Sequence, residues 1–114
     1  PVQYAYADFL QKSEIFLGLS AFYEAKRDTF LKYMAPSRFE ALVCHGTYFQ
    51  MMRYADISDE PDLEFARRLT IEHGVAAIPP SVFYHGRDDH KVLRFCFAKQ
   101  DKTLKQAAEK LCAI

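Results

Sequence analysis

A single arginine interrupts a segment that otherwise has the composition of a buried β-strand. The segment reads VLRFCFAK, residues 92–99, and its central charge is Arg94. Since side chains alternate along a strand, Leu93, Phe95 and Phe97 are expected to share one face. Arg94 falls on the other face, together with the less bulky Val92, Cys96 and Ala98. That face should leave room for a guanidinium group and for whatever binds it.

Two roles are open to such an arginine. Its planar, permanently charged fork matches a carboxylate in bidentate geometry, so it could receive an anionic group of a ligand. It could equally pair with one of the fifteen Asp and Glu residues of the chain and hold two elements in register. The strand pattern alone does not separate these two roles.

The other residues that could take part in catalysis or metal binding form no recognisable site. The four histidines lack the spacing of metal ligands, which argues against a metal site. Cys44 precedes His45, but catalytic Cys/His partners normally meet through the fold and not as sequence neighbours. No P-loop, GxSxG or GxGxxG motif is present. The acidic stretch DISDEPD, residues 56–62, could bind a cation or, more simply, supply the start of a helix.

The overall composition limits the class of protein. The 114 residues are half apolar, enough for one domain with a core, and 15 basic residues balance 15 acidic ones. With no net charge, the chain has no overall electrostatic attraction for nucleic acid or an anionic membrane. Three cysteines without CxxC spacing predict a reducing compartment, the cytoplasm. No apolar run approaches a membrane span, no leader opens the chain, and the start at Pro1 suggests a piece of something longer.

Periodicity predicts an α/β (α+β) sandwich. We expect a small, mostly antiparallel sheet of about four strands, helices packed on one face, and a long N-terminal helix. The N-terminal helical part spans residues 1–35, with Ser13 as a candidate N-cap, and the sheet-and-helix core spans 36–114. Strands are predicted in 38–43, 47–54, the first half of 75–84 and 92–99, and helices in 62–73 and after Asp101.

Three segments in this order and spacing resemble one enzyme family. They are GTYF at 46–49, GVAAIPPSVFY at 74–84 and LRFCFAK at 93–99. They are similar to the C-terminal part of class I, fold-type I aminotransferases, which depend on pyridoxal 5'-phosphate (PLP). The nearest branch holds the kynurenine, glutamine and methionine aminotransferases. The resemblance runs from PVQYA and FYEAKRD near the start to the last helix.

The resemblance implies roles for particular residues. In that family the position matching Arg94 binds the α-carboxylate of the substrate. The loop matching residues 78–83 borders the substrate pocket, so Ser81 and Phe83 are further candidates, with turn and packing roles as the alternative. The full-length protein would be a homodimer that transfers the amino group of an α-amino acid to a 2-oxo acid. Its substrate would be of the methionine, glutamine, aromatic or kynurenine type.

The resemblance also implies what these residues lack. The family holds PLP on a lysine, usually within an SxxK motif of the large domain, and no SxxK occurs here. We therefore expect no catalytic or cofactor-binding residue in this chain, no PLP bound to it and no activity on its own. Two alternatives remain at this point: a stand-alone module that binds a carboxylate ligand, and an interaction domain that uses the aromatic first helices.

Overall fold

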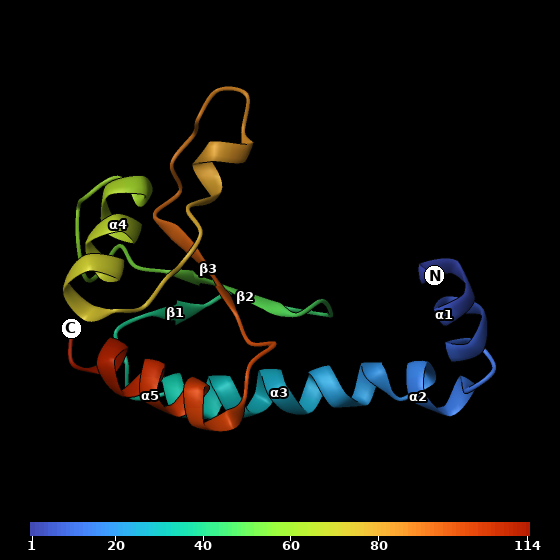
Figure 1. Ribbon diagram of the computed structural model, residues 1–114. Helices are drawn as coiled ribbons and strands as arrows, with labels where there is room; N and C mark the ends of the chain where they lie inside the picture. Colours follow the sequence, from blue (N-terminus) through green and yellow to red (C-terminus); the bar gives the residue numbers. More distant parts are fainter.

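The computed structural model describes residues 1–114 and shows an α+β fold (Figure 1). The chain opens with three helices: α1 (Val2–Phe9), α2 (Ser13–Leu17) and α3 (Leu19–Met34). The remaining elements are β1 (Glu40–Ala41), β2 (Phe49–Arg53), α4 (Asp62–His73), the 3₁₀ helix η1 (Pro80–Phe83), β3 (Val92–Cys96) and α5 (Asp101–Cys112). None of the helices has the length and apolar character needed to cross a membrane.

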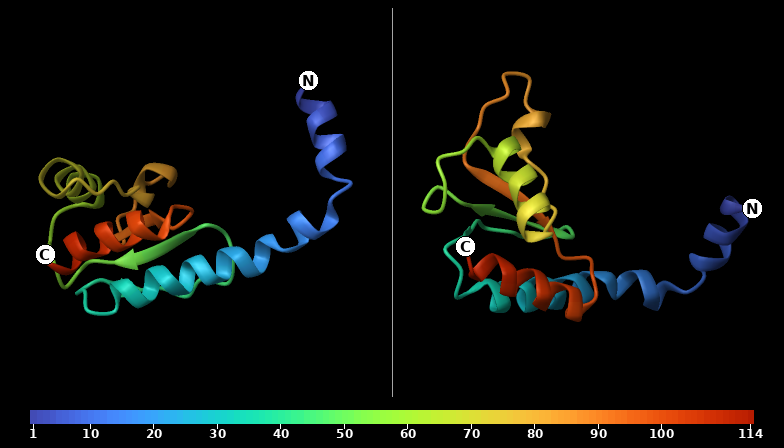
Figure 2. Two further views of the ribbon diagram at one scale, coloured as in Figure 1. Left: turned by 60° about the horizontal axis from the view of Figure 1, so that its bottom comes forward. Right: turned by 60° about the vertical axis from the view of Figure 1, so that its left-hand side comes forward.

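The long N-terminal helix predicted from the sequence corresponds to α3, and two shorter helices precede it. Lys12 leaves the helical region, with φ −103° and ψ 66°, so the chain turns between α1 and α2. Ser13 is the first residue of α2 and its side chain makes no capping hydrogen bond, so the predicted cap does not form. Helix α1 has no buried residue and projects away from the sheet in both views of Figure 2.

The sheet has three antiparallel strands in the order β1-β2-β3. The fourth strand expected in the first half of residues 75–84 is reduced to a single bridge between Ile78 and Arg94. Pro79 and Pro80 follow Ile78, and proline has no N–H to continue a ladder. The prediction of about four strands is therefore corrected to three strands and one bridge.

One face of β3 builds the core, as the alternation predicted. Leu93, Phe95 and Phe97 are all buried. They belong to one apolar cluster with residues of α3, α4 and α5, among them Phe30, Met34, Phe65, Leu69, Leu104 and Leu111. Helices α3 and α5 lie side by side under the sheet (Figures 1 and 2). Arg94, on the opposite face of β3, is thus directed away from this core.

Candidate functional site

Arg94 occupies the middle of β3, between β2 on one edge and Ile78 on the other. On one side it pairs with Met51 of β2. On the other side its N–H donates to the carbonyl oxygen of Ile78 (2.9 Å), and the N–H of Ile78 donates to the carbonyl oxygen of Arg94 (3.0 Å). A backbone fixed in this way gives the half-buried arginine side chain a defined starting point.

Two aromatic rings flank the guanidinium group of Arg94. Its Cζ atom lies 4.6 Å from the centre of the Phe49 ring and 5.8 Å from the centre of the Phe83 ring. Both distances fall in the range of cation–π attraction. No carboxylate forms an ion pair with Arg94, although other arginines of the chain are paired. Arg94 is therefore not neutralised by an acidic residue of the same chain.

A small hollow surrounds this guanidinium. Its volume is about 180 Å³, and its lining consists of Phe49, Met51, Pro80, Phe83, Tyr84 and Arg94. The walls are mostly apolar and Arg94 is the one charged group among them. The sequence suggested small neighbours for Arg94, but β2 and η1 bring large side chains to its face. The result is a half-buried cation among mostly apolar side chains, where a carboxylate would be bound more strongly than in open water.

The candidates Ser81 and Phe83 take different positions, although they lie two residues apart. Ser81 is 8% exposed and directs both of its donors to Asp62: the N–H to Oδ2 (2.8 Å) and the hydroxyl to Oδ1 (2.5 Å). Phe83 is 68% exposed and reaches the face of Arg94. The fold thus brings Arg94 and Phe83 together and turns Ser81 toward α4.

Phe49 was not identified from the sequence as a site residue. The alternation within residues 47–54 places it on one face of its strand, but only the register between β2 and β3 puts that face beside Arg94. Phe49 is one of the two aromatic rings that flank the guanidinium, and it approaches the guanidinium more closely than Phe83 does.

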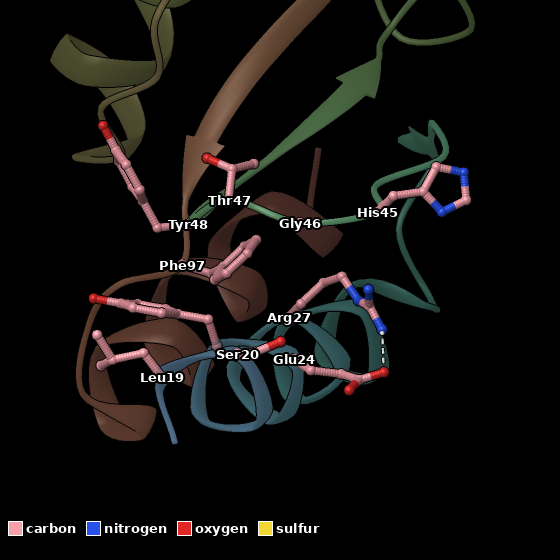
Figure 3. A pocket seen from close by; sticks show the side chains of 10 residues that line it. Leu19, Ser20, Glu24, Arg27, His45, Gly46, Thr47, Tyr48 and Phe97 are labelled. Atoms are coloured by element: carbon pink, nitrogen blue, oxygen red, sulfur yellow. Dashed lines mark hydrogen bonds and ion pairs between the residues drawn. The ribbon is translucent and has the colours of Figure 1, made fainter. Parts of the chain in front are cut away.

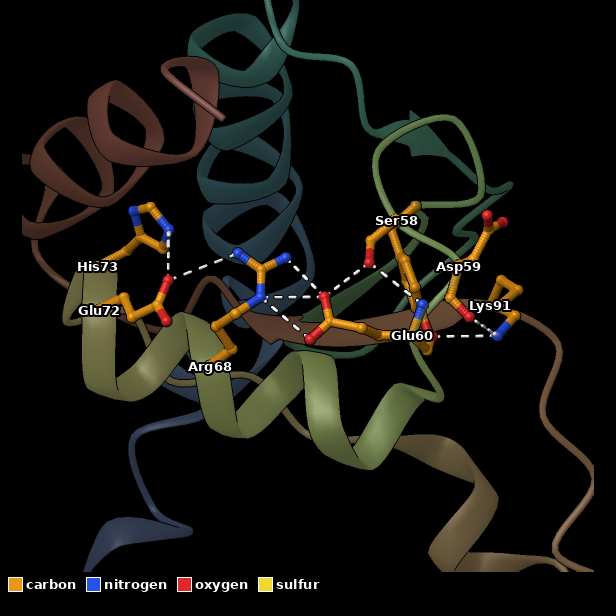
Figure 4. A network of polar contacts seen from close by, with 8 residues as sticks. Ser58, Asp59, Glu60, Arg68, Glu72, His73 and Lys91 are labelled. Atoms are coloured by element: carbon orange, nitrogen blue, oxygen red, sulfur yellow. Dashed lines mark hydrogen bonds and ion pairs between the residues drawn. The ribbon is translucent and has the colours of Figure 1, made fainter.

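The acidic stretch before α4 is engaged by basic residues (Figure 4). Arg68 donates to Glu60 through Nε and Nη2, with distances of 2.9 and 2.6 Å to Oε2. These hydrogen bonds, with a further one from Ser58, hold the pKa of Glu60 below its usual value. Lys91 donates to the carbonyl oxygens of Asp59 and Glu60. These contacts fasten the stretch to α4 and to the chain entering β3, and no three His, Cys, Asp or Glu side chains gather as metal ligands.

A larger hollow of about 400 Å³ lies between the start of α3 and the loop at residues 45–48 (Figure 3). Its arginine, Arg27, donates to Asp28 through Nε (2.9 Å) and to the carbonyl oxygen of Cys44 through Nη1 (3.0 Å). The thiol of Cys44 is directed to the carbonyl oxygen of Gly46 (3.0 Å), and no hydrogen bond joins it to His45. This hollow therefore lacks both the unpaired cation of the Arg94 site and a Cys/His pair.

The lysines do not provide a covalent cofactor site. None of them is buried. The partly buried Lys26 donates to Asp101 (2.6 Å), and the partly buried Lys91 donates to backbone oxygens and pairs with Asp89 (3.3 Å). A Schiff-base lysine needs a desolvated setting that lowers its pKa. The residues of this chain therefore do not fit the site that binds PLP covalently.

Comparisons with known proteins assign the chain to a family. The family model described as aminotransferase class I and II matches residues 1–111. The chain is 48% identical over 112 residues to the methionine aminotransferase of Escherichia coli (strain K12), covering 97% of this chain and 29% of that protein. It is 33% identical to the kynurenine–oxoglutarate transaminase of Dictyostelium discoideum, covering 97% of this chain and 31% of that protein.

Solved structures of aminotransferases are also similar to this chain. The crystal structure of YbdL from Escherichia coli, described with a methionine aminotransferase function, superposes with a TM-score of 0.93 at 47% identity. The superposition covers 100% of this chain and 30% of YbdL, so the chain spans less than a third of the relatives it matches. By the family match, the extent of identity and the superposition, the chain belongs to the class I and II aminotransferases.

Proposed function

We propose that this chain is the C-terminal domain of a longer PLP-dependent aminotransferase and that Arg94 binds the α-carboxylate of its substrates. The observation that carries this proposal is the unpaired guanidinium of Arg94 between Phe49 and Phe83. Within the domain, residues 1–35 form a helical interdomain segment and residues 36–114 form the sheet-and-helix core. The exposed apolar side chains of α1 would then pack on the remainder of the protein.

Arg94 would act by fixing the orientation of the substrate. A carboxylate that accepts two parallel hydrogen bonds from a guanidinium cannot rotate freely. Since the backbone of Arg94 is hydrogen-bonded to Ile78 and its strand pairs with β2, this clamp would place the α-carbon of an amino acid at a fixed position. PLP, bound by the rest of the longer protein, would supply the electron sink for the transfer of the amino group.

The walls of the Arg94 hollow favour a class of substrate. Phe49, Met51 and Phe83 are apolar and would tolerate an apolar or aromatic group near the carboxylate. The relatives are named for methionine and for kynurenine with oxoglutarate. We propose amino acids of the methionine, glutamine, aromatic or kynurenine type as amino donors and a 2-oxo acid as acceptor. We further propose a homodimeric, cytoplasmic full-length protein, as is typical of the family.

The test is transamination by the longer protein compared with the isolated chain. We expect the full-length protein, loaded with PLP, to convert L-methionine into its 2-oxo acid when a second 2-oxo acid is present. The isolated chain should be inactive with the same mixture because it has no lysine suited to hold PLP. Activity of the isolated chain, or a full-length protein that is inactive with every donor class named above, would contradict the proposal. A full-length protein that only binds carboxylates would support the alternative of a binding module.

A further inference from the structure

Asp62 is a buried carboxylate whose two oxygens serve one partner. It lies at the start of α4 and is 2% exposed. Oδ2 accepts the N–H of Ser81 and Oδ1 accepts the hydroxyl of the same residue, at 2.8 and 2.5 Å. Hydrogen bonds to an ionised carboxylate are about twice as strong as neutral ones, and burial strengthens them further. Asp62 and Ser81, 19 residues apart in sequence, thus form a strong contact between α4 and η1.

The backbone of Asp62 makes a second connection. Its N–H donates to Oδ2 of Asp89 (3.1 Å), and Oδ1 of Asp89 accepts the N–H of Lys91 (2.8 Å). Burial alone would raise the pKa of Asp89, but the hydrogen bonds from the Lys91 and Asp62 backbone and the charge of Lys91 together hold it below its usual value. Asp62 is therefore the point at which α4, η1 and the chain entering β3 meet.

These contacts fix the loop that carries Phe83 at two points. Ile78 is bonded to the backbone of Arg94, and Ser81 is bonded to Asp62. Pro79 and Pro80 lie between these points, and their rings restrict the backbone. Phe83 follows Ser81 within the same turn of η1. Because its ring is 68% exposed, packing does little to hold it, and its place beside Arg94 depends on how η1 is anchored.

We infer that Asp62 is a positioning residue for substrate binding: through Ser81 it fixes η1 so that Phe83 covers the guanidinium of Arg94. Asp62 itself does not touch the substrate in this role. The inference rests on the proposed carboxylate-binding function of Arg94 and adds a residue that the sequence did not single out. Its consequence is that the affinity for the amino acid depends on a carboxylate that is outside the binding hollow.

The test uses the full-length protein loaded with PLP and L-methionine as substrate. Asp62→Asn and Ser81→Ala should each raise KM by about 5- to 10-fold, the size expected for the net contribution of one hydrogen bond. The value of kcat should change by less than about twofold, since the loss is in binding. Ser81→Thr keeps the hydroxyl and should recover most of the affinity. Glu64→Gln, an exposed change in the same helix turn, is the matched control with unchanged KM.

A purely structural role for Asp62 would give a different result. It would lower the midpoint of thermal unfolding and leave KM for L-methionine at the wild-type value, which would overturn the inference. A double variant with Phe83 tests the inference more sharply, because it shows whether the two residues act on KM together. If Asp62 acts through that ring, Asp62→Asn should have little further effect on KM in a Phe83→Leu background. If the effects of Asp62→Asn and Phe83→Leu on the free energy of substrate binding simply add, the inference is also overturned.

The same set of variants separates this inference from the proposed function. If Arg94→Ala leaves KM unchanged, the function proposed for Arg94 fails and the role of Asp62 fails with it. If Arg94→Ala raises KM but Asp62→Asn and Ser81→Ala do not, only the role of Asp62 fails. Should Asp62→Asn prevent folding, Ser81→Ala decides the question, because it removes one hydroxyl and keeps the backbone hydrogen bond to Asp62.

Discussion

The ring of Phe49 lies against the guanidinium of Arg94, with 4.6 Å between the ring centre and Cζ. The two residues come from adjacent strands and lie diagonally across the β2–β3 pair, in which Met51 is the direct partner of Arg94. An aromatic ring uses the face of a guanidinium and leaves its N–H edge for a carboxylate. The contact therefore orients Arg94 without consuming the donors that a substrate would need.

Replacing Phe49 should weaken this orientation. In the full-length protein, Phe49→Leu keeps apolar bulk but removes the ring, and we expect KM for L-methionine to rise about fivefold, which corresponds to ~1 kcal/mol of cation–π attraction. Phe49→Tyr retains the ring and is the matched control, with KM close to the wild-type value. Steady-state kinetics measures both. Equal KM values for the Leu and Tyr variants would show that the ring is not needed.

The two faces of β3 should differ sharply in their effect on stability. Leu93 is fully buried, so Leu93→Ala should lower the free energy of unfolding by about 2–5 kcal/mol through lost burial and the cavity left behind. Cys96 lies on the opposite face and is itself exposed, so Cys96→Ala should change the free energy of unfolding by less than about 0.5 kcal/mol. Thermal or denaturant unfolding of the full-length protein measures the two effects. Similar effects at both positions would contradict the assignment of the faces.

The contact between Glu60 and Arg68 should make stability depend on pH. Hydrogen bonds from Arg68 and Ser58 hold the pKa of Glu60 in the folded protein below its value in the unfolded chain. A carboxylate with a depressed folded pKa contributes stability above its unfolded pKa, and this contribution is lost as pH falls through the folded pKa. Because both side chains are about one-third exposed, the contribution at pH 7 should be on the order of 0.5–1 kcal/mol.

Glu60→Gln measures this contribution. The temperature midpoint of unfolding of this variant should lie below that of the wild type at pH 7. The difference between the two midpoints should become smaller as pH falls below about 4. The exposed Glu109→Gln on α5 is the control, with no gap at either pH. A gap for Glu60→Gln that is the same at pH 7 and at pH 3 would contradict a role for the ionised carboxylate.

The local pattern of β3 could be predicted because it depends on a period of two residues. Alternation alone separates the buried Leu93 and Phe95 from Arg94, and the fold confirms it. The fourth strand was overestimated since Pro79 and Pro80 limit its pairing to Ile78. The helix start near residue 13 was anticipated from the candidate N-cap Ser13, although Lys12 takes the cap position and the helix is divided again at Gly18.

The surroundings of Arg94 depend on contacts between distant parts of the chain. Phe49 is 45 positions before Arg94, and only strand register brings the two together. The contact between Asp62 and Ser81 likewise joins a helix start to a 3₁₀ turn, and their neighbours in the sequence do not indicate that the two residues pair. Arg94, Ser81 and Phe83 were identified as candidates, the last two through family resemblance, whereas Phe49 and Asp62 became visible only in the fold.

The most direct measurement of the central claim is kcat/KM of the full-length protein for L-methionine with and without Arg94. Removing one half of a desolvated charge pair should weaken the substrate complex by roughly 2 to 5 kcal/mol, so Arg94→Ala should lower kcat/KM at least about 30-fold. Arg94→Lys keeps the charge but not the planar fork, and its value should lie between those of the alanine variant and the wild type. Unchanged kcat/KM for Arg94→Ala, with L-methionine and with the other proposed amino donors, would contradict the assignment of Arg94 as the carboxylate clamp.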